Sequence, residues 1–164
     1  MRAMVIPEFG GVELFEERDV DKPEPGAGEV LVRVFASSVN PVDTKLRADG
    51  SFAGLEPPVI LGGDVSGVVE EVGPGVTDLA SGDEVYYTPE IFGPGTNKAY
   101  AEYHVATADI VAKKPASLSH EEAAAVPLAG GTAYEAIVRR LAVRVGDTVL
   151  IQVEQGAWVT SRSR

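Results

Sequence analysis

Glycine and proline interrupt the first 115 residues so regularly that only short elements fit between them. The chain contains 18 Gly and 11 Pro, and most of them lie between short apolar runs. This spacing predicts short strands joined by tight turns. The clearest strand is residues 29–36, where Val30, Val32 and Val34 recur at the two-residue period that places side chains on one face.

Further elements follow from the same pattern. Additional strands are expected over residues 3–6, 12–16, 58–61, 65–72, 84–87, 99–105 and 109–113. A short helix is expected to begin at Asn40-Pro41-Val42-Asp43 and to stop by Gly50. Asn40 suits a helix cap, Pro41 suits the first helical position, and Asp43 suits the positive end of the helix dipole.

The pattern changes at Pro115. Ser119 and Glu122 have the spacing of a capping box, so a helix is expected there until Pro127 interrupts it. A second helix is expected from about Thr132 to Val143, with Ala133, Ile137 and Leu141 on one apolar face. Residues 148–151 form a continuous apolar run, which is typical of a strand buried in a parallel sheet.

Composition limits the classes of function. The chain has no cysteine, which excludes disulfide scaffolds and thiolate metal sites, and only two histidines, His104 and His120, to which we assign no role. The net charge of -11 disfavours nucleic acid and anionic membrane surfaces as partners. With no apolar run of membrane-spanning length, the expected protein is cytoplasmic. Its acidity suits either a salt-adapted host or an ordinary acidic bacterial protein.

The order of motifs resembles the medium-chain dehydrogenase/reductase superfamily, in particular its zinc-free quinone oxidoreductase (zeta-crystallin-like) branch. The residues that carry the resemblance are 28–34, 38–43, 61–69, 72–76, 82–86, 124–134 and 146–151. The resemblance implies a mainly β GroES-like domain over residues 1–118, followed over 119–152 by two helices and the first strand of a truncated α/β Rossmann domain. Residues 153–164 would be a tail outside the reading frame.

The resemblance also implies a reaction. In this branch a hydride passes from NADPH to a quinone or to an α,β-unsaturated carbonyl, and full-length relatives form homodimers or homotetramers. Zinc is not expected, because Asn40 and Gly63 stand where zinc-dependent members have a cysteine and a histidine. Two alternatives stay open: an enoyl-thioester reductase within the same family, and a non-catalytic GroES-like binding module or inactive truncated gene product.

Five residues are candidates for the nicotinamide and substrate cleft: Asn40, Asp43, Gly63, Asp64 and Thr132. By resemblance the Thr132 hydroxyl faces the nicotinamide, and it is the only cofactor-binding candidate in the chain. Each residue also has a plain structural interpretation. Asn40 and Thr132 suit helix starts, Asp43 a first-turn acid, Gly63 a bulge, and Asp64 a structural hydrogen-bonding group.

The tail from Val153 departs from the family pattern. A Rossmann site needs a glycine-rich turn after its first strand, yet residues 152–164 read QVEQGAWVTSRSR. We back-translated residues 153–163 with mostly G-ending codons. Read from the third base, these codons encode Gly-Ala-Gly-Gly-Val-Gly-His-Phe-Ala-Val. One G restored after the Gln152 codon adds the preceding Gly. We therefore hypothesise a one-base deletion or a sequencing error at this point.

Overall fold

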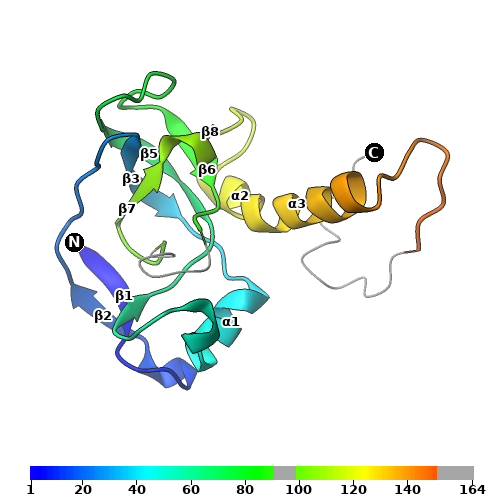
Figure 1. The fold of residues 1–164 in the computed structure, drawn as a ribbon. Coiled ribbons are helices and arrows are strands. Elements are labelled where there is room, and N and C mark those ends of the chain that lie inside the picture. Colours follow the sequence, from blue (N-terminus) through cyan, green and yellow to red (C-terminus); the bar gives the residue numbers. More distant parts are fainter. Residues whose placement is uncertain (91–98, 151–164) are drawn as a thin grey trace.

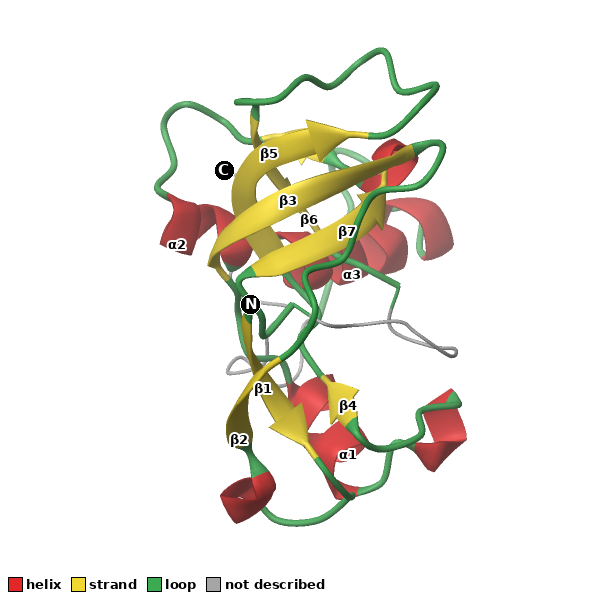
Figure 2. Cartoon of the chain, turned by 90° about the vertical axis from the view of Figure 1, so that its left-hand side faces the viewer, coloured by secondary structure: helices red, strands yellow, loops and turns green. Residues whose placement is uncertain are grey.

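The computed structural model describes residues 1–90 and 99–150. Its main sheet is antiparallel, with strands in the order β7-β3-β5-β6-β8 (Figure 2). These strands are β3 (Glu29–Ala36), β5 (Val65–Val72), β6 (Glu84–Tyr87), β7 (Tyr103–Thr107) and β8 (Ala112–Lys113). Val30, Val32, Val65, Val69 and Val85 are buried in the core of this sheet, so the two-residue period of β3 is confirmed.

A smaller sheet lies at the other end of the β part, beside α1 (Figure 2). It has the order β2-β1-β4, formed by β1 (Arg2–Ile6), β2 (Glu16–Asp19) and β4 (Val59–Ile60). Helix α1 (Pro41–Ala48) ends before Gly50, as expected. Ile6, Leu46 and Leu61 are fully buried in a second apolar cluster that joins this sheet to α1. Short 3-10 turns occupy Val12–Leu14, Ser51–Ala53 and Ala108–Ile110.

Two helices follow the sheets. Helix α2 (His120–Ala124) packs against β5, β3 and β6, and α3 (Pro127–Tyr134) then runs outward from the β part (Figure 1). A π-helical stretch, Glu135–Arg140, continues α3. The capping box of Ser119 and Glu122 is confirmed: the Ser119 hydroxyl accepts the Glu122 N–H at 3.2 Å, and the Glu122 carboxylate accepts the Ser119 N–H at 2.9 Å.

The expected mainly β architecture followed by helices is confirmed, but several boundaries were wrong. Residues 12–14 form a 3-10 turn, and the return strand comes later, at Glu16–Asp19, where it pairs with residues 2–5 of β1. The expected strand 99–105 lies at Tyr103–Thr107, preceded by a single bridge between Ala101 and Ala3. Over 109–113, only Ala112–Lys113 pairs as a strand.

The C-terminal predictions need the largest corrections. The second helix begins at Pro127 rather than near Thr132, because proline fits the first turn of a helix and here starts one. Residues 148–150 form no strand, because the described part of the chain offers them no neighbouring strand to pair with. Ile151 and the 153–164 tail lie outside the described residues. Over the described ranges, no helix combines the length and the apolarity that crossing a bilayer requires.

Candidate functional site

Asn40 and Asp43 meet at the first turn of α1. Asn40 precedes the helix, as predicted, and forms a capping box with Asp43, in which each side chain faces the backbone N–H of the other residue. In one half of this box, Asp43 Oδ2 accepts the Asn40 backbone N–H at 2.7 Å. The amide nitrogen of Asn40 points inward, where Nδ2 donates to Asp64 Oδ2 at 2.7 Å.

Several hydrogen bonds of the site converge on the carboxylate of Asp64, and we call this residue with its hydrogen-bond donors the Asp64 junction. Asp64 is 1% exposed. Its carboxylate accepts hydrogen bonds from the Ser38 hydroxyl, the Asn40 amide and the backbone N–H of Leu128, the last at 2.8 Å to Oδ1. Leu128 is in the first turn of α3, whose dipole favours a carboxylate there. Burial raises the pKa of Asp64, and these three donors oppose that rise.

Asp43 is buried with fewer partners. Its Oδ1 atom has no hydrogen-bond partner among the described residues, although the residue is only 4% exposed. Burial raises the pKa of Asp43, and the N–H of Asn40 and the nearby Tyr100 hydroxyl oppose that rise. Burial, and then the negative charge of the nearby Asp43, raises the pKa of Tyr100.

Gly63 faces the same atoms. A Cβ added to Gly63 would lie 3.9 Å from Asn40 Nδ2 and from Asp43 Oδ1, and 3.8 Å from Leu128 Cδ2. These are ordinary van der Waals distances. The Gly63 carbonyl accepts the Thr88 hydroxyl at 2.6 Å. The loop that holds Gly63 thus links the Asp64 junction to the wall of a neighbouring pocket.

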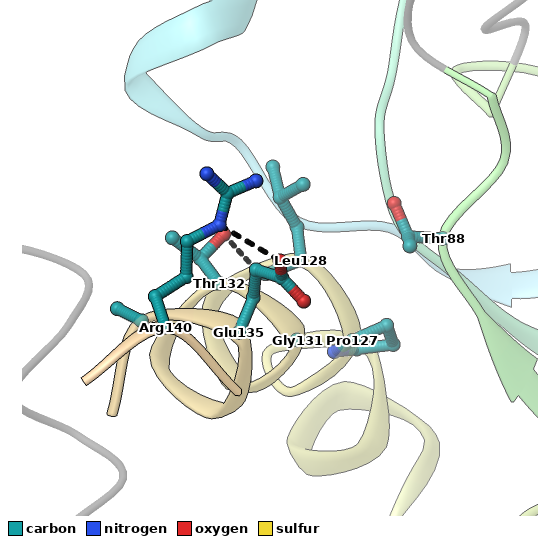
Figure 3. A pocket seen from close by; sticks show the side chains of 8 residues that line it. Thr88, Pro127, Leu128, Gly131, Thr132, Glu135 and Arg140 are labelled. Carbon is teal, nitrogen blue, oxygen red and sulfur yellow. Dashed lines mark hydrogen bonds and ion pairs between the residues drawn. The ribbon is translucent and has the colours of Figure 1, made fainter. Parts of the chain in front are cut away.

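That pocket has a volume of about 470 Å³ and opens beside α3 (Figure 3). Its lining residues are Thr88, Pro127, Leu128, Gly131, Thr132, Glu135, Ala136 and Arg140. Apolar groups form most of its wall, while Glu135 and Arg140 pair at 3.0 Å on one side. The Thr132 hydroxyl donates to the Leu128 carbonyl at 2.7 Å, which leaves its oxygen lone pairs to accept a hydrogen bond.

The structure therefore brings four of the five predicted residues, Asn40, Asp43, Gly63 and Asp64, around one point. Thr132 lies one turn along α3 from Leu128, which touches that point. Sequence reasoning missed Ser38, Thr88, Leu128 and the pair formed by Glu135 and Arg140. Ser38 could have been found from its place two residues before Asn40 in the same motif. Leu128 likewise lies in the motif of residues 124–134. Thr88 carries no such signal, since it contributes through a contact distant in sequence.

The side chains of the site indicate which kind of bound group it could hold, a metal ion or an organic ring. No group of three or more His, Asp or Glu side chains that could hold a metal ion occurs in the two described ranges. The Asn40 amide, Gly63 and Leu128 around Asp64 supply neither thiolate nor imidazole. A mostly apolar pocket with the hydroxyl groups of Thr88 and Thr132 in its wall instead suits a flat ring carrying a polar substituent.

Comparison with known proteins points to one family. Residues 26–116 match the family described as the alcohol dehydrogenase GroES-like domain. Human quinone oxidoreductase is 36% identical over 159 residues, and the match covers 95% of this chain and 46% of that protein. The chloroplastic NADPH-dependent alkenal/one oxidoreductase of Arabidopsis thaliana is 39% identical over 145 residues, 85% of this chain and 37% of that protein.

A solved structure agrees in fold. An alcohol dehydrogenase superfamily protein from Novosphingobium aromaticivorans superimposes with a TM-score of 0.90 at 37% identity, over 98% of this chain and 48% of that one. The chain thus spans about half the length of the relatives it matches.

Proposed function

Since the chain belongs to the alcohol dehydrogenase GroES-like domain family, within the medium-chain dehydrogenase/reductase superfamily, we propose that it forms the substrate-side part of a zinc-independent, NADPH-dependent reductase of quinones or α,β-unsaturated carbonyls. The observation that carries the proposal is the Asp64 junction. Asn40, Gly63 and Leu128 surround it without a metal-ligating side chain, and the apolar pocket with Thr132 lies beside it. The names of the human and Arabidopsis relatives support the substrate class and the cofactor.

In this proposal the chain's residues bind and orient. Bound NADPH would supply the hydride. The apolar walls formed by Pro127, Leu128 and Ala136 exclude water from the ring that enters the pocket. The Thr132 hydroxyl accepts a hydrogen bond from a carboxamide and fixes which face of the ring is turned to the substrate. Asp64 holds the first turn of α3 and so keeps Thr132 at its position.

The proposed domain division follows the motif order. Residues 1–118 would be the GroES-like domain and 119–152 the entry to a nucleotide-binding domain. The glycine-rich turn that would hold the cofactor's pyrophosphate is missing from residues 152–164. That observation favours a second candidate for the 164-residue chain by itself, namely a GroES-like module without catalytic activity.

A chimera separates the two candidates. Residues 1–150 are joined to the nucleotide-binding half of human quinone oxidoreductase, and NADPH oxidation is followed at 340 nm with a quinone or an enone. We expect acceptor-dependent oxidation that a zinc chelator leaves unchanged. Thr132→Val should raise KM for NADPH, whereas Thr77→Val, at an exposed turn, should not. A folded chimera without NADPH oxidation supports the module, and loss of activity with chelator refutes zinc independence.

The 164-residue chain is titrated with NADPH in parallel, by fluorescence of the reduced nicotinamide. No saturable binding is expected, because the phosphate-binding turn is missing from its sequence. Tight binding would contradict the view that this chain by itself is incompetent.

A further inference from the structure

His120, to which sequence reasoning gave no role, contacts three strands of the main sheet. It is the first residue of α2, directly after the cap Ser119. Its Nδ1 lies 2.8 Å from the Ser66 hydroxyl oxygen on β5, and its Nε2 lies 3.4 Å from Glu84 Oε1 on β6. Its ring stacks on Phe35 of β3, with centroids 4.7 Å apart and planes 20° apart. One side chain therefore joins α2 to three strands.

The residues that contact His120 make further interactions with other parts of the chain. Glu84 also pairs with Lys114, whose Nζ lies 3.2 Å from Oε2. The Lys114 side chain is 4% exposed and donates to the Leu118 carbonyl at 2.6 Å, which fixes the connection leading into α2. On β3, the Arg33 guanidinium lies over the Phe35 ring, 4.8 Å from its centroid.

Asp64 lies directly before β5, and Ser66 is the second residue of that strand. Asp64 holds the Leu128 N–H in α3, and Ser66 holds His120 in α2. One end of one strand thus fixes two consecutive helices. The two attachments set the direction in which α3 leaves the sheet, and with it the wall of the pocket that contains Thr132 (Figure 1).

His120 links Ser66 to Glu84, and we call these three residues the bridge. Both ring nitrogens of His120 can keep a hydrogen-bond partner whether the imidazole is neutral or charged. In the neutral ring with the proton on Nε2, Nε2–H donates to Glu84 and Nδ1 accepts the Ser66 O–H. In the charged ring, Nδ1–H donates to Ser66, whose hydroxyl proton then turns to the Val85 carbonyl, 3.2 Å away. The charged groups facing the ring are Glu84 from β6, Lys114 behind it, Arg33 beyond Phe35, and Glu121 on α2 itself.

The order Ser–His–Glu resembles a hydrolase triad, but Ser66 is fully buried, so no substrate reaches its hydroxyl. We propose instead that His120 is a positioning residue: the bridge Ser66–His120–Glu84 fixes α2, and through it the pocket-lining face of α3, against the sheet in both charge states of the ring. What the positioned pocket does depends on the proposed function; the positioning itself does not.

The test uses the 164-residue chain, with amide hydrogen exchange over α2 and α3 as the readout. His120→Phe keeps the stacking on Phe35 but loses both polar contacts, so exchange in α3 should rise about tenfold, the effect of losing one to two hydrogen bonds. His120→Asn places an amide near the Nδ1 position and should restore most of the protection. Ser117→Ala, in the exposed turn before α2, is the control and should leave exchange unchanged.

Nitrogen-15 chemical shifts of the wild-type ring give a second readout that a merely packed histidine would not share. The neutral ring should carry its proton on Nε2, the tautomer that donates to Glu84 and leaves Nδ1 to accept from Ser66. Protection unchanged in His120→Phe, or a neutral ring protonated on Nδ1, would overturn the proposal. Because no NADPH or substrate is present, an inactive chimera with an intact bridge would count against the proposed function alone.

Discussion

Two buried carboxyl groups lie at the centre of the site, and the number of donors around each decides what it contributes. Asp64 accepts three hydrogen bonds and connects β5 to α1 and α3. Asp43 accepts one backbone N–H, and its second oxygen has no partner in the described part of the chain. An unsatisfied buried charge is a cost to the folded state, whereas a well-hydrogen-bonded one holds structure together.

This difference predicts opposite responses to amide substitution. Asp64→Asn should lower the free energy of unfolding by about 1–3 kcal/mol, because a neutral amide cannot accept all three donors. Asp43→Asn keeps an oxygen for the Asn40 N–H and removes a buried charge, so stability at neutral pH should be unchanged or higher. Urea unfolding at pH 7 measures both. Equal destabilisation by the two variants would contradict this account.

The same carboxyl group predicts a pH dependence. The native pKa of Asp43 is raised above the ordinary value of 3.8, so the folded state holds the proton more tightly than the unfolded state does. Its contribution to stability is complete below about pH 3.8 and is lost as the pH rises through the raised native value. Urea unfolding between pH 3 and 7 measures this loss of stability, which should be absent from Asp43→Asn. If the free energy of unfolding depends on pH in the same way in Asp43→Asn and in the wild type, the prediction is refuted.

Two glycines form a matched pair. Gly63→Ala should change stability by less than about 1 kcal/mol, since a Cβ there meets only ordinary contacts at 3.8–3.9 Å. Gly67→Ala should cost at least about 3 kcal/mol, because its Cβ would lie 2.1 Å from the Arg33 carbonyl oxygen of the neighbouring strand. Thermal unfolding of the two variants measures both effects. A loss of stability in Gly63→Ala as large as that in Gly67→Ala would contradict the ordinary contacts that the structure shows beside Gly63.

At the scale of elements, local signals placed the starts of α1 and α2 well, but not the start of α3 or the face that it presents. Ala133, Ile137 and Leu141 were expected on one apolar face, but Ala133 is 4% exposed and Leu141 is 64% exposed. The reason is the π-helical stretch, in which the Leu141 N–H bonds to Ala136, five residues back. The wider turn rotates later residues out of register and brings Glu135 within 3.0 Å of both Arg139 and Arg140.

The cap of α2 supplies the element-scale prediction. Ser119→Ala removes the acceptor of the Glu122 N–H and should lower the free energy of unfolding by about 1 kcal/mol. Ser117→Ala, in the exposed turn just before, is the control and should have little effect. Circular dichroism during urea unfolding measures both. Equal shifts for the two variants would mean that the cap contributes nothing to stability.

At the scale of the whole molecule, the chain divides into two apolar clusters, one in each sheet, followed by a helical segment that leaves them. β2 is an edge strand whose four residues, Glu16–Asp19, are all charged and exposed, which discourages pairing with another chain. β2 is therefore a protected edge of the smaller sheet.

The residues after Gln152 carry a prediction that nucleotide sequence decides. Sequencing across codon 152 should find that one added G opens a frame encoding Gly-Gly-Ala-Gly-Gly-Val-Gly, the phosphate-binding turn that the family places after its first Rossmann strand. Codons for Val153 to Ser163 that do not yield this turn in the shifted frame would refute the hypothesis.

The sequence by itself determined the elements whose causes are local. Strands β3, β5 and β6, the start of α1 and the cap of α2 follow from two-residue periodicity, turn residues and capping side chains, all within a few residues of each other. It also determined the family, because its motifs extend over nearly the whole chain. The same motifs indicated Asn40, Asp43, Gly63, Asp64 and Thr132, without saying what each one touches.

Only the tertiary structure decided how those residues are used. It brought the Asn40 amide to Asp64, left Asp43 Oδ1 without a described partner, and joined Ser66 to His120 across 54 residues. It also left residues 148–150 without strand pairing. Each of these outcomes depends on which groups far apart in the chain come together, and no local pattern encodes that.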